Sequence, residues 1–358
     1  MHHTDRVGVV KHFTYRLPDQ RVVFGNGVLD RLAEEADARG ITRALVVSSP
    51  GRAEMAARAA RILGPACVGV SDAATLNVPA RAVDAAKAAA SEAAADGLIV
   101  LGGGSAVGLG KALAVESGMP WIAVVTTYSG SEMSDNWTVV HADGPIAGRD
   151  PSALAGTVLY DPELTLDIPP HFSAASGMNA MAHAVESLYG AAANPVTDSM
   201  AAEAVRTIGV ALPRVCAEPG DLAHRNAMLY GAWLAATFRG GLAISHRIAQ
   251  SMRKAFNLIH AETHAAVLPH AVAFNQGAAP FAMRAIENSL GADNAAAALY
   301  DLNAALALKT GFKDLGVKDW DVDKAAAVVL AQPFHNPRAP KLEDVRRLLE
   351  DIYEGGRP

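Results

Sequence analysis

Cysteine and aromatic residues are both scarce in this sequence. The 358 residues include 2 cysteines, and aromatic side chains make up 6% of the chain. Cys67 and Cys216 lie far apart and form no CxxC pair, so the sequence predicts neither a disulfide framework nor a thiolate metal site. A reducing compartment fits this cysteine usage, and we therefore expect a cytoplasmic protein.

Long apolar runs and a strong excess of one charge are also missing. No hydrophobic stretch reaches the roughly 20 residues that a membrane-spanning helix needs, and the start MHHTDRVGVVKHF lacks the apolar core of a signal peptide. The formal net charge of −6 argues against nucleic acid or an anionic membrane surface as the main partner. With 51% hydrophobic and 19% charged residues, the composition is typical of an ordinary soluble protein with a large core.

The first part of the chain alternates between short β-branched runs and alanine-rich helical stretches. The runs are RALVVSS (43–49), CVGVSD (67–72), GLIVLGGG (97–104) and WIAVVTT (121–127), with helix-like segments at 52–63, 79–95 and 105–117. This alternation predicts right-handed crossovers and a Rossmann-like parallel sheet covered on both faces. Ahead of it, RVVFGNGVLDRL (21–32) is typical of a strand, a turn and the start of a helix.

The pattern changes near residue 165, where YDPELTLDIPPHF (160–172) introduces a cluster of prolines. Beyond it the hydrophobic period is almost wholly helical, with breaks near 192–196, 217–221, 277–280, 291–294 and 334–341. A chain of 358 residues suggests about two domains of about 150 residues each. We therefore predict an α/β domain over residues 1–165 and an all-helical domain over residues 166–358.

The segment LIVLGGGSAVGLGKALAV (98–115) joins an apolar strand to three glycines, a serine and a helix start. Glycines let the backbone approach a pyrophosphate, and the N–H groups of a helix start attract phosphate. The segment is neither GxGxxG nor a P-loop, so a tight strand-to-helix turn is the alternative, and Lys111 either neutralises phosphate or faces solvent. A second polar strand end favours a nucleotide site, because ligands of open α/β sheets bind at such ends. The candidate residues are Gly102, Gly103, Gly104, Ser105, Thr126, Thr127 and Ser131, with Tyr128 beside them.

The segment SGMNAMAHAVESLY (176–189) predicts a helix with Asn179, His183 and Glu186 on one face, at spacings of four and three residues. Taken singly, such groups are more often satisfied polar groups of a core. A concentration of histidines farther along makes a shared cleft the better interpretation, since a helix break near Asn257 would return part of it toward this helix. These histidines are His246, His260, His264 and His270.

Five motifs resemble, in their order and spacing, the iron-containing alcohol dehydrogenase family. They are LGGGS, TTYSGSEMS, YDPELT, SGMNAMAHAVESLY and NLIHAETHAAVLPHAVAFN, and the resemblance extends over about residues 12 to 350. The chain is most similar to the maleylacetate reductase branch, because Gly108 replaces an Asp, Tyr128 matches TTYxGSE, and residues 260–264 match HAETH. The resemblance implies a dehydroquinate synthase-like architecture in which a nucleotide-binding α/β domain precedes a helical domain. It also implies NAD or NADP as cofactor, an active site between the domains, and a homodimer that pairs edge strands such as RVVFG.

The resemblance assigns a role to the polar face of the 176–189 helix. Metal-dependent relatives bind their metal with a carboxylate and three histidines, and the matching positions here are Asn179, His183, His246 and His260. An amide is a neutral and weaker donor than a carboxylate, and the branch is usually regarded as working without metal. We therefore expect that no metal is required; if one were bound, these four residues would be its ligands.

The chain departs from the branch in one segment. Where the branch reads HHKLCHTLGGTFNLPH, this chain has SHRIAQSMRKAFNLIH (245–260), and Asn77 replaces the His of an HVP segment. Gln250 stands for a His and cannot act as acid or base near neutral pH, so a proton relay through that position is lost. Either neutral drift or a changed substrate explains the difference.

These patterns predict an NAD(P)H-dependent reductase of a small keto acid or activated enoic acid that carries a carboxylate. His246 is the expected acid, with His183, His260 and Tyr128 as further catalytic candidates. Ser48 adds to the cofactor site, and the absence of Asp or Glu near it predicts that NADPH is tolerated. The alternatives are a diverged relative with another biosynthetic reaction, its nicotinamide cofactor retained or lost, and a non-catalytic binding protein. Candidates for substrate binding are Asn179, Arg239, Arg247 and Gln250.

Overall fold

The computed structural model describes residues 13–15, 17, 19–238, 241 and 243–358. The chain forms two compact units, one spanning Pro18–Asp167 and the other combining Met1–Leu17 with Ile168–Pro358. All strands of the described part belong to the first unit, and the second is helical. The predicted fold class, an α/β unit and a helical unit, is therefore confirmed. Tyr15, which precedes the sheet in the chain, belongs to the helical unit, and its hydroxyl donates to Met200 Sδ at 3.8 Å.

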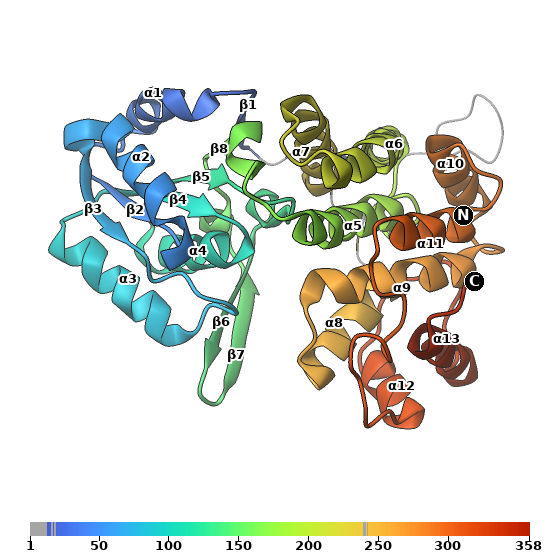
Figure 1. The fold of residues 1–358 in the computed structure, drawn as a ribbon. Coiled ribbons are helices and arrows are strands. Elements are labelled where there is room, and N and C mark those ends of the chain that lie inside the picture. Colours follow the sequence, from blue (N-terminus) through green and yellow to red (C-terminus); the bar gives the residue numbers. More distant parts are fainter. Residues whose placement is uncertain (1–12, 16, 18, 239–240, 242) are drawn as a thin grey trace. The chain divides into compact units, whose positions relative to one another are not determined.

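Parallel strands form the six-stranded sheet of the α/β unit (Figure 1). In spatial order they are β1 (Arg21–Phe24), β8 (Thr157–Tyr160), β5 (Trp121–Val125), β4 (Gly97–Gly102), β2 (Ala44–Val47) and β3 (Cys67–Ser71). The four inner strands are buried along their whole length, as a sheet covered on both faces requires. β1 lies at one edge, and the pairing of two copies there remains a prediction.

Helices cover both faces of this sheet. On one face, α1 (Leu32–Ala38) and α2 (Ala53–Leu63) share a core with inward residues such as Ile99. On the other, α3 (Ala80–Glu92) precedes α4 (Gly104–Ser117), whose backbone at Gly110 lies so close to Val100 that a Cβ would come within 2.5 Å of that side chain. Ile99 and Val100 point to opposite faces because side chains alternate along a strand.

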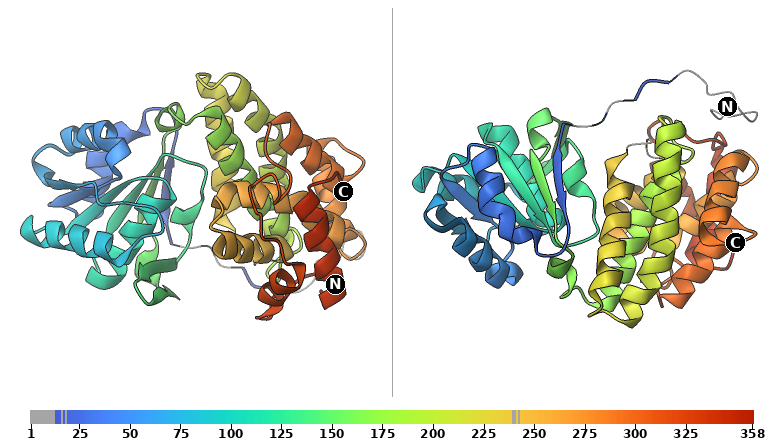
Figure 2. Two further views of the ribbon diagram at one scale, coloured as in Figure 1. Left: turned by 60° about the horizontal axis from the view of Figure 1, so that its bottom comes forward. Right: turned by 90° about the horizontal axis from the view of Figure 1, so that it is seen from above.

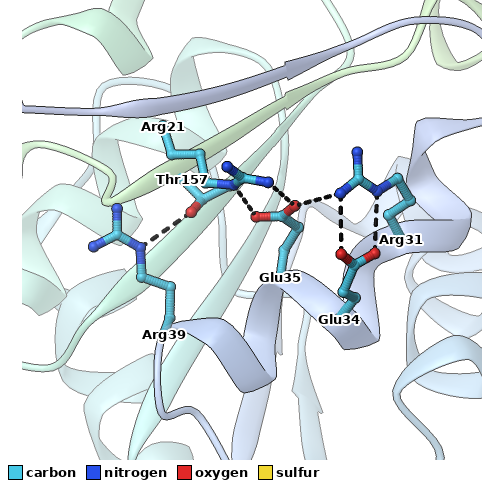
Figure 3. Close-up of polar contacts among 6 residues, drawn as sticks. All are labelled: Arg21, Arg31, Glu34, Glu35, Arg39 and Thr157. Atoms are coloured by element: carbon cyan, nitrogen blue, oxygen red, sulfur yellow. Dashed lines mark hydrogen bonds and ion pairs between the residues drawn. The ribbon is translucent and has the colours of Figure 1, made fainter.

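Two further features complete the α/β unit. A hairpin of β6 (Asn136–His141) and β7 (Gly144–Arg149) forms a separate antiparallel pair, which the sequence patterns do not single out. Figure 3 shows the second feature, in which the buried Glu35 carboxylate accepts from Arg21 Nε at 2.7 Å and from Arg31 Nη2 at 3.3 Å. This network fixes the edge strand β1 to α1.

The helical unit consists of nine α-helices in its described residues. They are α5 (Pro170–Ser187), α6 (Pro195–Ala217), α7 (Leu222–Thr237), α8 (Ile244–Phe256), α9 (His260–Asn275), α10 (Pro280–Leu290), α11 (Ala295–Ala305), α12 (Val322–Leu330) and α13 (Leu342–Glu354). In Figure 2, α5, α6 and α7 lie alongside one another, and α5 also packs on α9. Within the described residues no helix combines the length and the apolar character needed to cross a bilayer.

Candidate active site

The start of α4 is open to a ligand. Gly103 is the N-cap of the helix, so the helix start has no side-chain cap hydrogen bond among the described residues. A Cβ added at Gly104 would find its nearest atom, Ser129 Oγ, at 3.8 Å, whereas one at Gly103 would come within 2.7 Å of the Thr127 side chain. Packing therefore requires glycine at position 103, and position 104 leaves free space beside the N–H groups that attract phosphate.

Four hydroxyl groups at this carboxyl edge of the sheet are buried and have no hydrogen-bond partner among the described residues. Ser48 follows β2, and Thr126, Thr127 and Ser129 follow β5. Buried hydroxyls normally have partners, so these oxygens are suited to the ribose and phosphate groups of a ligand. Together with the open helix start they fit a nicotinamide dinucleotide. The remaining predicted cofactor residues, Ser105 and Ser131, are half-buried.

Lys111 does not face solvent, which was one of its two predicted alternatives. The side chain is buried, and Nζ donates to Ser134 Oγ at 2.7 Å and to the Asn136 carbonyl at 3.0 Å. Lys111 thus ties α4 to the segment that follows β5 instead of facing solvent. Tyr128, predicted as catalytic, is buried in the α/β unit.

The helical unit gathers four histidines in one cluster. His246 on α8 and His183 on α5 place their Nε2 atoms 3.3 Å apart. The His264 ring centroid on α9 lies 4.4 Å from that of His246 and 4.6 Å from that of His260. Asn257 ends α8 in the left-handed conformation, with φ of 51°, and the turn returns the start of α9 to the cluster. The predicted helix break near Asn257 is therefore confirmed.

His264 belongs to this cluster, although the family motif does not assign it a role. It is fully buried, and neither ring nitrogen has a hydrogen-bond partner among the described residues. Its position one helical turn after His260 was the available signal, because residues four apart on a helix share a face. His270, two turns along, is also buried but shares no ring contact with the cluster in the described part of the chain.

Three histidines of the cluster are held neutral. Burial, followed by the charges of His246 and His260, lowers the pKa of His183 well below its usual value. Burial and the same two neighbours also lower the pKa of His264. For His260, desolvation and then the Arg253 charge lower the pKa to about 4. Neutral rings present one N–H and one lone pair each, so the cluster can donate to or accept from a small polar ligand.

Glu186 connects this cluster to the start of α8, although no sequence motif assigns it a role. The carboxylate is almost fully buried, and Oε2 lies 2.5 Å from Nδ1 of His246. It also accepts from the backbone N–H groups of Ala243 at 3.0 Å and Ser245 at 2.7 Å. The three-residue spacing from His183 placed it on the same face, but the spacing alone could not reveal a partner on α8.

The predicted substrate-binding residues differ in burial and in contacts. Asn179 is buried one turn before His183, and its Oδ1 has no partner among the described residues. Arg247 has contacts within the helical unit, where Nε donates to the Val329 carbonyl at 2.7 Å and the guanidinium lies over the Phe334 ring. Arg247 therefore joins α8 to α12, and its role in holding a substrate carboxylate remains a prediction. Gln250 is half-buried on α8, and Arg239 lies outside the described residues.

The predicted metal ligands fit an ion only in part. The 3.3 Å between the Nε2 atoms of His183 and His246 is about what two ligands at about 2.1 Å from one tetrahedral ion would show. Asn179 Oδ1, which has no hydrogen-bond partner among the described residues, is a further oxygen that could serve as a ligand. His260 is not close enough to complete a set, since the described residues bring three His, Cys, Asp or Glu ligand atoms within 4.8 Å of one another only at Glu218, Asp221 and His224.

Two family models match this chain over most of its length. "Iron-containing alcohol dehydrogenase" matches residues 19–162, and "Fe-containing alcohol dehydrogenase family, C-terminal" matches residues 173–353. The chain therefore belongs to the iron-containing alcohol dehydrogenase family, which is a family of oxidoreductases. Within it, the predicted placement in the maleylacetate reductase branch is confirmed by the relatives described next.

Similarity to maleylacetate reductases extends over nearly the whole chain. The enzyme from Burkholderia cepacia is 44% identical and aligns with 97% of this chain and 98% of its own length. The crystal structure of maleylacetate reductase from Agrobacterium tumefaciens is 37% identical, covers 98% of this chain and all of its own (100%), and has a TM-score of 0.94. A sulfoacetaldehyde reductase from Bifidobacterium kashiwanohense, solved in complex with NAD+, is 22% identical with a TM-score of 0.87 over 96% of this chain and 99% of its own. That last likeness shows the fold alone.

Proposed function

We propose that this chain uses NADH or NADPH to reduce the carbonyl or activated C=C of a small carboxylate-bearing acid, with maleylacetate as the first substrate to test. The similarity to maleylacetate reductases at up to 44% identity over 97% of the chain carries this proposal. The open start of α4 and the buried histidine cluster support it, because the two features supply the dinucleotide site and the acid that such a reduction needs.

Each part of the proposed machinery has a separate task. The bound dihydronicotinamide supplies the hydride. The N–H groups at the start of α4 hold the pyrophosphate, and the hydroxyls of Ser48, Thr126 and Thr127 orient the rest of the cofactor. His246 stabilises the developing negative charge on the substrate oxygen and gives it a proton from Nε2. Burial of the cluster excludes water, which strengthens these interactions.

The altered end of α8 favours an anionic substrate. Arg253 and Lys254 stand where the branch has two glycines, and the Arg253 charge contributes to lowering the pKa of His260. A cation this near the cluster attracts a carboxylate. This observation keeps open the second candidate, a diverged reductase whose acid differs from maleylacetate.

A panel of keto acids tests the function. We expect the purified protein to oxidise NADH in the presence of maleylacetate or a related acid, with the rate followed by the loss of dihydronicotinamide absorbance. NADPH should serve within about a thousandfold of NADH, roughly 4 kcal/mol, because no carboxylate follows β2 to repel the 2′-phosphate. Binding of NADH without turnover of any acid would favour the non-catalytic alternative. The absence of both NADH binding and turnover would refute the proposal.

Activity is expected to survive exhaustive chelation. Asn179 replaces the carboxylate of metal-dependent relatives, so the site lacks a ligand charge that would attract a divalent cation. Metal content and turnover are measured on the same chelated sample. The Asn179→Asp variant restores the charge and is the matched comparison, in which we expect about one zinc ion per chain after incubation with zinc and removal of the excess. Full loss of wild-type activity on chelation, restored by one equivalent of zinc or iron, would show that Asn179 serves a metal site.

A further inference from the structure

The Glu186 carboxylate on α5 contacts both the backbone at the start of α8 and the ring of His246. Its Oε1 accepts from the backbone N–H of Ser245 at 2.7 Å and of His246 at 3.4 Å, and its Oε2 accepts from Ala243 at 3.0 Å. Oε2 also lies 2.5 Å from Nδ1 of His246. The Glu186 and His246 side chains are 1% and 2% exposed, so water does not compete for these contacts. The Glu186 carboxylate therefore caps the start of α8 and also contacts the ring of His246.

We propose that Glu186 is a positioning residue of the active site, which fixes His246 as the Nδ1–H tautomer and presents Nε2 to the reacting groups. Backbone N–H groups point at both carboxylate oxygens, so both act as acceptors. The ring nitrogen at 2.5 Å must then carry the hydrogen of that contact. A carboxylate that accepts from one ring nitrogen fixes which tautomer the other nitrogen shows, as in hydrolase triads.

The fixed tautomer sets the direction of hydrogen bonding within the cluster. A neutral His246 with hydrogen on Nδ1 has its lone pair at Nε2, and His183 Nε2 is 3.3 Å away. His183 is then the donor to His246, and a single hydrogen lies between the two Nε2 atoms. Without Glu186, the His246 ring could carry its hydrogen on either nitrogen or rotate so that the two nitrogens exchange places. The orientation of His183 would then no longer be set.

The catalytic consequence rests on the proposed reductase function. In the reduction, the hydride that the bound cofactor would supply forms the new C–H bond. The substrate oxygen takes a proton from Nε2 of His246 when the ring carries a hydrogen on each nitrogen, and the step leaves the neutral ring with its hydrogen on Nδ1, toward Glu186. Glu186 ensures that His246 meets the oxygen with Nε2. Loss of Glu186 should thus slow turnover more than it weakens substrate binding, because the ring would still be present but would lack the carboxylate that holds Nδ1–H and balances the charge of the second hydrogen.

Helix capping alone is the competing explanation, and the chain offers a matched control for it. Asn336 Oδ1 accepts from the backbone N–H of Ile244 at 3.3 Å, so Asn336 also caps α8. It is held by Asn275, to which its amide donates at 2.7 Å, and has no contact with His246 in the described residues. Asn336→Ala therefore loosens the start of α8 without changing the partner of the histidine ring.

Nitrogen-15 spectra of the histidine side chains test the tautomer directly. We expect the wild-type protein to show His246 protonated at Nδ1, with the signal assigned by its loss in His246→Ala. In Glu186→Gln, the amide carbonyl accepts from the backbone and the NH2 group donates to Nδ1, so the hydrogen moves to Nε2. Asn336→Ala should keep the wild-type tautomer. An Nε2–H tautomer in the wild-type protein overturns the inference, and this spectrum decides even if Glu186→Gln fails to fold.

Kinetics separate positioning from capping. We expect kcat of Glu186→Gln to fall about 10- to 100-fold, the usual effect of removing a partner that orients a ligating or reacting histidine, with KM within about threefold of wild type. Asn336→Ala should keep kcat within about threefold. Equal losses in the two variants would mean that Glu186 acts only as a cap. If the wild-type protein reduces no acid, the proposed function fails, whereas the spectra still decide the role of Glu186.

Discussion

Replacing His246 with alanine is expected to slow reduction of the substrate acid by about a hundredfold or more, the usual cost of losing a general acid. His246 is buried, its Nδ1 contacts Glu186, and its Nε2 faces His183 at 3.3 Å. It is therefore the ring of the cluster with a partner on each nitrogen. Removing it leaves both His183 and Glu186 without their shared partner.

His264 and His270 provide the comparison for this variant. Both are buried on α9, and alanine at either position also creates a cavity, but only His264 contacts the cluster. We expect His246→Ala to lose more turnover than His264→Ala, and His270→Ala to retain most of it. Thermal unfolding of all three variants separates loss of catalysis from loss of the fold. Near-normal turnover in a folded His246→Ala protein would move the acid role to His183, His260 or Tyr128.

The sequence predicts the histidines of the site better than their partners. Spacing along one helix places Asn179, His183 and Glu186 on one face, and the family motif adds His246 and His260. That Glu186 meets α8 depends on packing between helices about sixty residues apart in the chain, which local periodicity does not encode. His264 is among the histidines predicted to share a cleft, but no role is predicted for it, because its contact with His246 also joins two helices.

The fold also depends on contacts that local sequence periodicity does not encode. The sequence patterns predict the strands that alternate with helical segments. They do not predict β8, because its four residues run directly into the proline-containing boundary. Its place between β1 and β5 is a property of the whole sheet. Arg247 is a different case. Its charge suggests a substrate anchor, and nothing in the sequence around residue 247 reveals that it also donates to a carbonyl group near the end of α12.

Glycine at position 104 is the best place to test cofactor binding. The structure changes the choice of residue, since sequence alone would favour Gly103, the middle glycine of the motif. A side chain at Gly103 would meet Thr127 within 2.7 Å, so loss of binding in that variant would also report damage to the α/β unit. At Gly104 the nearest atom to an added Cβ is 3.8 Å away, and the backbone does not have positive φ. A larger residue at position 104 therefore fits the protein without cofactor.

Gly104→Val is accordingly expected to fold normally and to weaken NADH binding by at least about tenfold, or about 1.4 kcal/mol. The branched side chain occupies the space beside the first N–H groups of α4, which no side chain caps, and keeps the pyrophosphate from approaching them. Calorimetry with NADH measures the affinity, and thermal unfolding confirms the fold. Gly277→Val, at a turn of the helical unit where an added Cβ meets no atom within 4 Å, is the matched control and should bind NADH as the wild type does. Unchanged NADH affinity in a folded Gly104→Val protein would place the cofactor somewhere other than the start of α4.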